Sequence, residues 1–269
     1  MLDWLQKLKT QASQSPLRPR VDFYAQNMKI GSVEPVFMHN LALKVNADKR
    51  KKLLKCEQSD WYLTADSPDV THGLGLLAHA LRSLGLAGAW RNEQLAVRSD
   101  SGLQIGTIER GAIRPFGIAT LAVHLVGHTA DGRFWAQQRA LTKPNDPGKW
   151  DTLMGGMVSA ADTVATALGR ETWEEAGLRI SQLQNVLHGG VLKIQQPAID
   201  GKGVGYVVED IHWYTCTVPD GVLPVNQDGE VAQFVLMDNA QLLAAMQQGE
   251  FTLEAALIFA SVLGLIDQR

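Results

Sequence analysis

Three closely spaced glutamates, Glu171, Glu174 and Glu175, are the side chains of this sequence best suited to chemistry. They stand at i, i+3 and i+4, so a helix through this segment would bring all three carboxylates onto one face. Like charges held so close repel one another, and a divalent cation among them relieves that repulsion. Carboxylate oxygens are ligands that Mg²⁺ or Mn²⁺ prefers, with water and phosphate oxygens filling the other positions. The spacing therefore predicts a site for Mg²⁺ (or Mn²⁺).

The helix that would position these carboxylates has recognisable ends. Asp162 is the predicted N-cap, because its short carboxylate can accept from the first free backbone N–H groups. Gly177 stands where a left-handed C-terminal cap favours glycine. The residues that can face a core at helical spacing are Val164, Ala165, Ala167, Leu168 and Thr172.

A solvated acidic helix face is the plain alternative, since a charge run usually faces water. That alternative explains neither the glycines before the helix nor the single Arg170 ahead of the glutamates. The segment resembles the signature of the Nudix hydrolases, G-x5-E-x7-R-E-U-x-E-E-x-G-U, where U is apolar. Two positions depart, because Asp162 replaces a glutamate and Thr172 an aliphatic residue. The positions in register are Gly156, Arg170, Glu171, Glu174, Glu175, Gly177 and Leu178.

The resemblance implies roles for the residues in register. Glu171, Glu174 and Glu175 would hold the metal, with the Gly156 backbone carbonyl as the family's usual additional ligand. Arg170 would orient a glutamate, with a surface ion pair as the alternative. The residue that takes the proton from water is Glu171 or a glutamate from a later loop. Arg170 and Glu171 are therefore the predicted catalytic pair.

Composition sets outer bounds. The chain has 269 residues, 45% of them hydrophobic, a net charge of −3 and a pI of about 6.2. It can bury one large or two smaller cores, and it has no dominant basic patch for nucleic acid. Cys56 and Cys216 lack metal-ligand spacing and suit a reducing compartment. We find no signal-peptide pattern and no membrane-spanning run, so the expectation is a cytoplasmic protein. The sequence leaves a homodimer open.

The N-terminal part predicts a small α+β domain over residues 1–112. An internal echo, with 29–34 resembling 104–109, suggests two similar hairpins around helices, and chance similarity of short strands is the alternative. The boundary is placed near Ala112, before the change of character at Ile113–Phe116, and limited proteolysis should cut there if the joint is exposed. The predicted elements are a helix at 2–12, strands within 21–36, helices at 40–54 and 69–86, and a hairpin at 95–109.

The second part, residues 113–269, predicts an α/β fold. Strands before and after one central helix, with further helices at the end, indicate a mixed sheet covered on both faces, the α/β/α sandwich of the Nudix resemblance. The predicted strands are 120–128, 134–140, 186–194, 205–218 and 230–237, and the predicted terminal helices are 238–247 and 252–266.

Flanking segments are similar to one Nudix subfamily, proteins related to thiamine pyrophosphokinase that carry an uncharacterised N-terminal domain. Fungal and plant members are associated with hydrolysing oxidised thiamine diphosphate to its monophosphate. The similar segments are 122–125, 135–139, 143–144, 147–151, 224–231 and 249–252.

Five further residues are candidate substrate ligands. Arg139 suits bidentate phosphate binding, and Lys143 could act as a point charge, with exposure to solvent as its alternative. Trp150 could stack on a flat cationic ring such as that of thiamine. Glu209 and Glu230 could supply an extra ligand or a base, or could be solvated strand-end residues.

The expected function is metal-dependent hydrolysis of a P–O–P bond in a small diphosphate, in which the metal neutralises phosphate charge and activates water. Oxidised thiamine diphosphate is the substrate implied by the subfamily resemblance. The alternatives are a hydrolase of nucleotide sugars or dinucleotides such as ADP-ribose, and a Nudix-shaped module that binds a ligand without turnover. Intact helix carboxylates argue against the second alternative.

Overall fold

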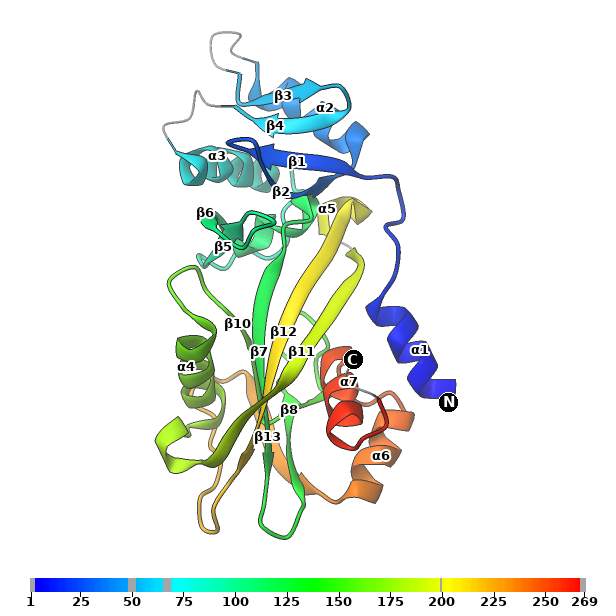
Figure 1. The fold of residues 1–269 in the computed structure, drawn as a ribbon, viewed down its shortest axis with the longest axis vertical. Helices are drawn as coiled ribbons and strands as arrows, with labels where there is room; N and C mark the ends of the chain where they lie inside the picture. The colour runs from blue at the N-terminus through cyan, green and yellow to red at the C-terminus, as the bar shows by residue number, and fades with distance from the viewer. Residues whose placement is uncertain (1–2, 48–51, 65–68, 199, 267–269) are drawn as a thin grey trace.

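The chain forms an elongated molecule with a smaller layer at one end and a large sheet at the other (Figure 1). The computed structural model describes residues 3–47, 52–64, 69–198 and 200–266. The N-terminal elements are α1 (Asp3–Ala12), β1 (Val21–Ala25), β2 (Met28–Val33), α2 (Pro35–Val45), β3 (Leu54–Glu57), β4 (Asp60–Leu63), α3 (Val70–Ser83), β5 (Gln94–Arg98) and β6 (Gln104–Glu109).

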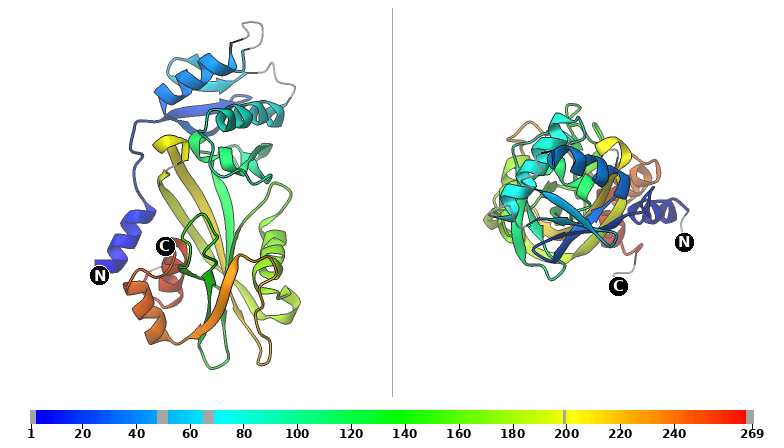
Figure 2. Two further views of the ribbon diagram at one scale, coloured as in Figure 1. Left: turned by 180° about the vertical axis from the view of Figure 1, so that it is seen from behind. Right: turned by 90° about the horizontal axis from the view of Figure 1, so that it is seen from above.

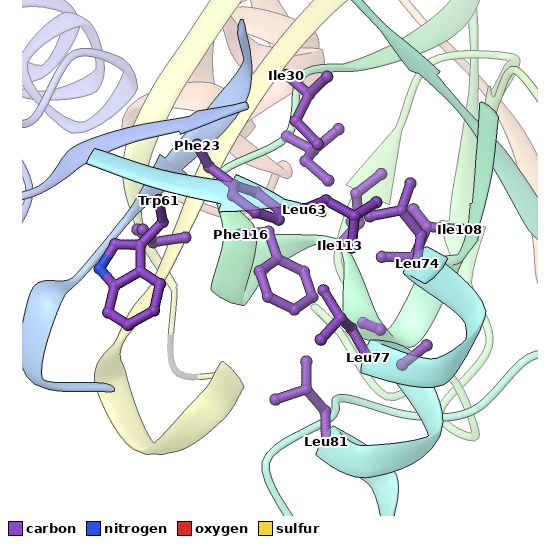
Figure 3. Close-up of a cluster of buried hydrophobic side chains, with 14 of the residues drawn as sticks. Phe23, Ile30, Trp61, Leu63, Leu74, Leu77, Leu81, Ile108, Ile113 and Phe116 are labelled. Atoms are coloured by element: carbon purple, nitrogen blue, oxygen red, sulfur yellow. The ribbon is translucent and has the colours of Figure 1, made fainter. Parts of the chain in front are cut away.

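The smaller layer contains a four-stranded sheet in the order β2-β1-β4-β3, with β1 and β4 parallel, and the separate hairpin β5–β6. Helices α2 and α3 bury their apolar sides in the same core. Phe23 and Phe116 stack at its centre with ring centroids 5.5 Å apart (Figure 3). The aliphatic residues Leu74, Leu77 and Leu81 come from α3 at helical spacing, which is why that helix was readable from sequence.

The two echoing segments are β2 and β6, each the second strand of an antiparallel hairpin. The glutamate at the end of each segment caps the helix that follows it. Glu34 accepts from the backbone N–H groups of Val36 and Phe37 at the start of α2. Glu109 accepts from the N–H of Gly111 in the short 3₁₀ helix η1 (Arg110–Ala112).

The joint between the two parts is packed. The N-terminal core includes Ile113, Phe116 and Ile118 from the joint, and Val204 from far along the chain. The 3₁₀ helix η2 (Arg114–Phe116) lies within this joint. Conversely, α1 packs on α7 and β11 of the large sheet's half, as both Figure 1 and Figure 2 show. A domain boundary at residue 112 stays a prediction. The hydrophobic core on each side of this position includes residues from the other side.

The larger part is a seven-stranded mixed sheet. The path β11-β12-β7-β8-β13 includes the parallel pair β12–β7, while β10 pairs with β7 and β9 with β8. β7 and β8 pair only at His128 and Phe134, so the two strands diverge beyond that point and short strands fill the opening. The strands are β7 (Thr120–His128), β8 (Phe134–Arg139), β9 (Trp150–Asp151), β10 (Met154–Met157), β11 (Gln184–Ala198), β12 (Gly205–Thr217) and β13 (Val231–Met237).

Helices cover both faces of this sheet, as the α/β/α expectation required. Alternation along β7 divides the faces: Val123 and Leu125 pack toward α4, and Ala122 and Val126 toward α7. None of the helices in the described ranges is long and apolar enough to cross a membrane. The helices are α4 (Val164–Ala176), α5 (Asp200–Gly203), α6 (Asn239–Gln247) and α7 (Leu253–Val262), with the 3₁₀ turn η3 at Ile180–Gln182.

One N-terminal prediction was wrong. The helix expected at 40–54 begins earlier, at Pro35, and ends at Val45, so only its first residues were predicted correctly. Strand β3 begins at Leu54, where the helix was expected to end. Residues 48–51 of that prediction lie outside the described part of the chain. Pro35 explains the earlier start, because proline is favoured in the first helical turn and Glu34 caps it.

Candidate active site

Helix α4 carries the predicted carboxylates, and its cap differs from the one predicted. The N-cap is Thr163, which forms a reciprocal capping box with Thr166. Asp162 lies one residue earlier and accepts hydrogen bonds from the Arg170 guanidinium and the Ser159 hydroxyl. The helix ends at Gly177 in the left-handed conformation (φ 63°), as expected. Asp162 thus ties the preceding loop to the helix rather than capping it.

Arg170 is the hub of the acidic cluster. Its Nη1 donates to Glu171 Oε1 and Glu174 Oε2, each at 2.9 Å, and its Nε donates to Asp162 at 2.9 Å. Nη2 donates to the Met157 carbonyl oxygen at 3.2 Å. Burial alone would lower the pKa of Arg170, but attraction to Glu171 and Asp162 outweighs it and raises the pKa. Arg170 is therefore hydrogen-bonded to both glutamates, and its orienting role in catalysis stays a prediction.

Glu171 lies against the Gly156 backbone. A Cβ added at Gly156 would lie 2.1 Å from the Glu171 carboxyl carbon, so any other residue there would displace the carboxylate. The Glu171 side chain is 13% exposed. Burial is the main reason that its pKa rises to about 7, with Glu175 and Glu174 adding to the rise and Arg170 opposing it.

Glu175 is the most deeply buried of the three glutamates, with its side chain only 2% exposed. It accepts hydrogen bonds from the Gly155 N–H at 2.9 Å and from Gln137 Nε2 at 2.8 Å. Lys143 Nζ lies 3.2 Å from its Oε1 and also pairs with Glu230. Burial raises the pKa of Glu175 even against these partners. Burial alone would lower the pKa of Lys143, but attraction to Glu175 and the hydrogen bond to Glu230 raise it.

The donor set fits a hard divalent cation by its chemistry. Glu171, Glu174 and Glu175 offer carboxylate oxygens, and Gly156 lies in contact with Glu171. Within the described residues, no three His, Cys, Asp or Glu side chains already converge as a ligand set. The carboxylates are instead directed to Arg170 and Lys143. A metal would therefore take over contacts that these two cations make.

The carboxylates open into a cavity of about 650 Å³. Among the described residues that line it, ten acidic side chains outnumber six arginines and lysines. The negative excess would favour binding of a cation. Of the predicted site residues, those that line the cavity are Gly156, Arg170, Glu171, Glu174, Glu175, Arg139, Lys143, Glu209 and Glu230.

Arg139, Lys143 and Trp150 are placed differently from one another. Arg139 is held by Asp151 Oδ2 at 3.2 Å and by the Asn145 carbonyl oxygen at 3.1 Å. The side chain of Lys143 is only 14% exposed, so the solvent-exposed alternative is wrong. Trp150 is partly buried against the core around α7, and the structure does not bring it to the cavity lining.

Several lining residues escaped sequence reasoning. Glu254, in the first turn of α7, lines the cavity, and burial raises its pKa to about 7. Its only sequence signal was a lone acidic residue at the start of an apolar helix. Arg91 and Arg110 reach the cavity from the N-terminal part of the chain, and Arg114 reaches it from the joint. No local pattern distinguishes these arginines from ordinary surface residues.

Residues 119–257 match the family described as NUDIX domain, which is just over half of the 269-residue chain. The chain therefore belongs to the Nudix family. The mixed sheet between α4 on one face and α6 and α7 on the other, together with the glutamates of α4, agrees with that membership.

The chain is similar to Nudix hydrolase 24, chloroplastic, of Arabidopsis thaliana, at 30% identity over 65% of this chain and 49% of that protein. Uncharacterized protein YJR142W of Saccharomyces cerevisiae is 24% identical over 79% of this chain and 68% of its own length. The chain thus spans about half the length of the plant relative. The crystal structure of DR0079 from Deinococcus radiodurans is 20% identical, with a TM-score of 0.47, over 60% of this chain and 92% of that one.

Proposed function

We propose that this protein is a metal-dependent hydrolase that cleaves the P–O–P bond of a small diphosphate. The observation that carries the proposal is one cavity in which Glu171, Glu174 and Glu175 of α4 face Lys143 and Arg139. Carboxylates can hold a divalent cation, and the two basic side chains can meet phosphate oxygens. Family membership and the name of the plant relative support the same chemistry.

Held by the three glutamates and the Gly156 carbonyl, Mg²⁺ (or Mn²⁺) would neutralise phosphate charge and activate water for attack. The protein's own groups have separate tasks. Arg170 holds Glu171 and Glu174 in their directions. Glu171 is the proposed acceptor of the water proton, because Arg170 holds its carboxylate within the cluster that would bind the cation. Glu254 lines the same cavity, and burial raises its pKa to about 7, near the working pH that suits a general base, so it is the second candidate.

For the substrate, we propose oxidised thiamine diphosphate, converted to its monophosphate with release of phosphate. The support is the resemblance of the flanking segments to the subfamily related to thiamine pyrophosphokinase. ADP-ribose and nucleotide sugars are the competing substrates, and a ligand-binding module without turnover is the competing class. A terminal diphosphate would present one accessible P–O–P bond to the carboxylates.

The test is turnover of a panel with Mg²⁺: oxothiamine diphosphate, thiamine diphosphate, ADP-ribose and an ordinary nucleotide. The expected result is the highest kcat/KM for oxothiamine diphosphate. A tenfold advantage of ADP-ribose or the nucleotide, about 1.4 kcal/mol, would reject the thiamine substrate and leave the Nudix chemistry. No turnover of any panel member would favour the binding module.

A glutamate-to-glutamine pair tests the two candidate bases, with Glu254→Gln as the decisive member because Glu171→Gln also removes a proposed metal ligand. Glu171→Gln should lower kcat severely, while Glu254→Gln should leave most activity if Glu171 is the base. Removing a general base costs about 10²–10⁴-fold in rate. The reverse order would assign the proton transfer to Glu254.

A further inference from the structure

A second compartment adjoins the proposed catalytic cavity. It has a volume of about 260 Å³ and shares several lining residues with the larger cavity, among them Arg91, Arg110, Arg114 and Val207, so the two lie side by side. The N-terminal segment around η1 and η2 forms one of its walls, and the beginning of β12 forms another. A ligand bound at the α4 carboxylates could therefore extend into a space that the Nudix half alone does not enclose.

The walls combine apolar surface with arginine. Ile113 and Ile118 contribute buried aliphatic side chains, and Met157 lies at the boundary with the larger cavity. Apolar walls with a few placed polar groups are typical of sites that bind the organic part of a small ligand. In the larger cavity the carboxylates could hold a divalent cation, and Arg139 and Lys143 could meet phosphate oxygens, so that cavity suits the diphosphate end instead. The two compartments thus differ in the part of a substrate that each would accept.

The loop that carries Arg91 is firmly held. The Arg91 backbone N–H donates to Glu109 Oε1 at 2.8 Å, and Glu109 is buried. The Gly88 N–H donates to the Gly111 carbonyl oxygen at 2.7 Å. A Cβ at Gly111 would lie 2.6 Å from the Ala89 carbonyl oxygen, so this close approach needs glycine. The wall is therefore in place before a ligand arrives.

The charge of this compartment is positive. Three arginines line it, and among the described lining residues the one acidic side chain is Glu209, which accepts from the Thr120 hydroxyl at 2.8 Å. Arg110 is paired with Glu93 at 2.8 Å, and Arg91 is exposed. A cationic ring would be repelled here, whereas a neutral ring with an acceptor oxygen could take a guanidinium hydrogen bond.

We propose that this second compartment binds the organic part of the substrate and selects an uncharged ring with an acceptor oxygen over a cationic ring. The inference rests on the proposed function for the position of the diphosphate. It makes the N-terminal part of the chain a specificity element of the catalytic cavity. It also assigns to Arg91 the donor that would distinguish oxothiamine, with its ring carbonyl, from thiamine, with its thiazolium charge.

Two variants of the full chain test this, each with a matched control. Arg91→Glu reverses the charge at an exposed position, and Arg98→Glu makes the same change outside both cavities. Ala89→Trp places bulk at the rim of the second compartment, and Leu103→Trp places it at a hairpin residue that is 60% exposed. The probes are oxothiamine and thiamine diphosphates in turnover, and their monophosphates in titration calorimetry.

The wild type should prefer the neutral ring in both assays. Arg91→Glu should reduce that preference at least tenfold, and Ala89→Trp should raise KM and Kd for both ring-bearing probes at least tenfold with kcat little changed. Both controls should match the wild type. An unchanged preference in Arg91→Glu, or wild-type affinities in Ala89→Trp, would overturn the proposal. If no diphosphate is turned over, the proposed function fails, while calorimetry with the monophosphates still decides the role of the compartment.

Discussion

Replacing Lys143 by methionine should destabilise the metal-free protein and make it depend on Mg²⁺. Lys143 Nζ lies 3.2 Å from Glu175, whose side chain is 2% exposed, and Lys143 itself is 14% exposed. Methionine keeps much of the length of the lysine side chain but removes the ammonium group. Glu175 would then be a buried carboxylate that keeps only its hydrogen bonds from Gly155 and Gln137.

Removing one partner of a buried ion pair costs about 3–5 kcal/mol, because the remaining charge is uncompensated. We take the lower end, about 3 kcal/mol, since Glu175 keeps two hydrogen bonds. The loss should depend on pH. The pKa of Glu175 is raised in the folded state, so its carboxylate costs stability as pH rises and costs nothing below the ordinary glutamate pKa of 4.5, where the carboxyl is protonated in both the folded and the unfolded state. The difference between variant and wild type should therefore shrink as pH falls toward 4.5.

The assay is urea unfolding at pH 7.5 and pH 5, with chelator and with Mg²⁺. Lys149→Met is the matched control, because Lys149 pairs with Asp146 at 2.9 Å with both side chains 42% exposed. Such a surface pair contributes about 0–1 kcal/mol. A cation bound beside Glu175 should raise the unfolding free energy of the variant by about 2.7 kcal/mol at a hundred times its Kd, and that of the wild type by less, because Lys143 competes with the cation for Glu175.

Equal unfolding free energies for Lys143→Met and Lys149→Met in chelator would refute the reasoning about the buried pair. A full loss that Mg²⁺ leaves unchanged would instead refute the idea that metal and lysine serve the same carboxylate.

Four other outcomes are expected. Glu175→Gln should abolish Mg²⁺-dependent diphosphate hydrolysis, and near-normal rates in chelator would contradict the metal assignment. Gly156→Ala should lower kcat/KM about 100-fold by displacing Glu171, the scale of a 1 Å misplacement, with a folded circular dichroism spectrum as the check. Limited proteolysis should spare residues 110–118 of the native chain, because the joint is largely buried, and rapid cleavage there would show a looser joint. Glu254→Gln should be more stable than the wild type at pH 8.5 by less than about 3 kcal/mol and equal to it near pH 4, measured by urea unfolding, because the raised pKa of Glu254 makes its stability contribution disappear as pH rises through about 7.

The acidic helix was predictable because its information is local. Glu171, Glu174 and Glu175 share a face through helix geometry alone, and Gly177 ends the helix through a backbone conformation that glycine favours. The N-cap was misassigned because Asp162 and Thr163 are adjacent and are both good N-cap residues. Only the folded structure shows that the Asp162 carboxylate accepts from Arg170 instead of capping the helix.

Short strands were harder to predict. β9 has two residues and β10 four, too few for a periodic pattern, and both exist because β7 and β8 diverge and leave unpaired backbone groups to satisfy. The burial of Lys143 could not be predicted from the sequence either, because the Glu175 carboxylate that pairs with it lies 32 residues further along the chain.

The sequence by itself determined the Nudix signature, the helix that carries it and the longer strands that precede and follow it along the chain, since each follows from spacing within one segment. Only the tertiary structure decided which residues face those carboxylates. Arg91 and Arg114 reach the cavity because Ile113 of the joint packs in the N-terminal core. Val204, directly before β12, packs in the same core. Contacts between segments so distant in the chain depend on the whole packed core, and no spacing within either segment encodes them.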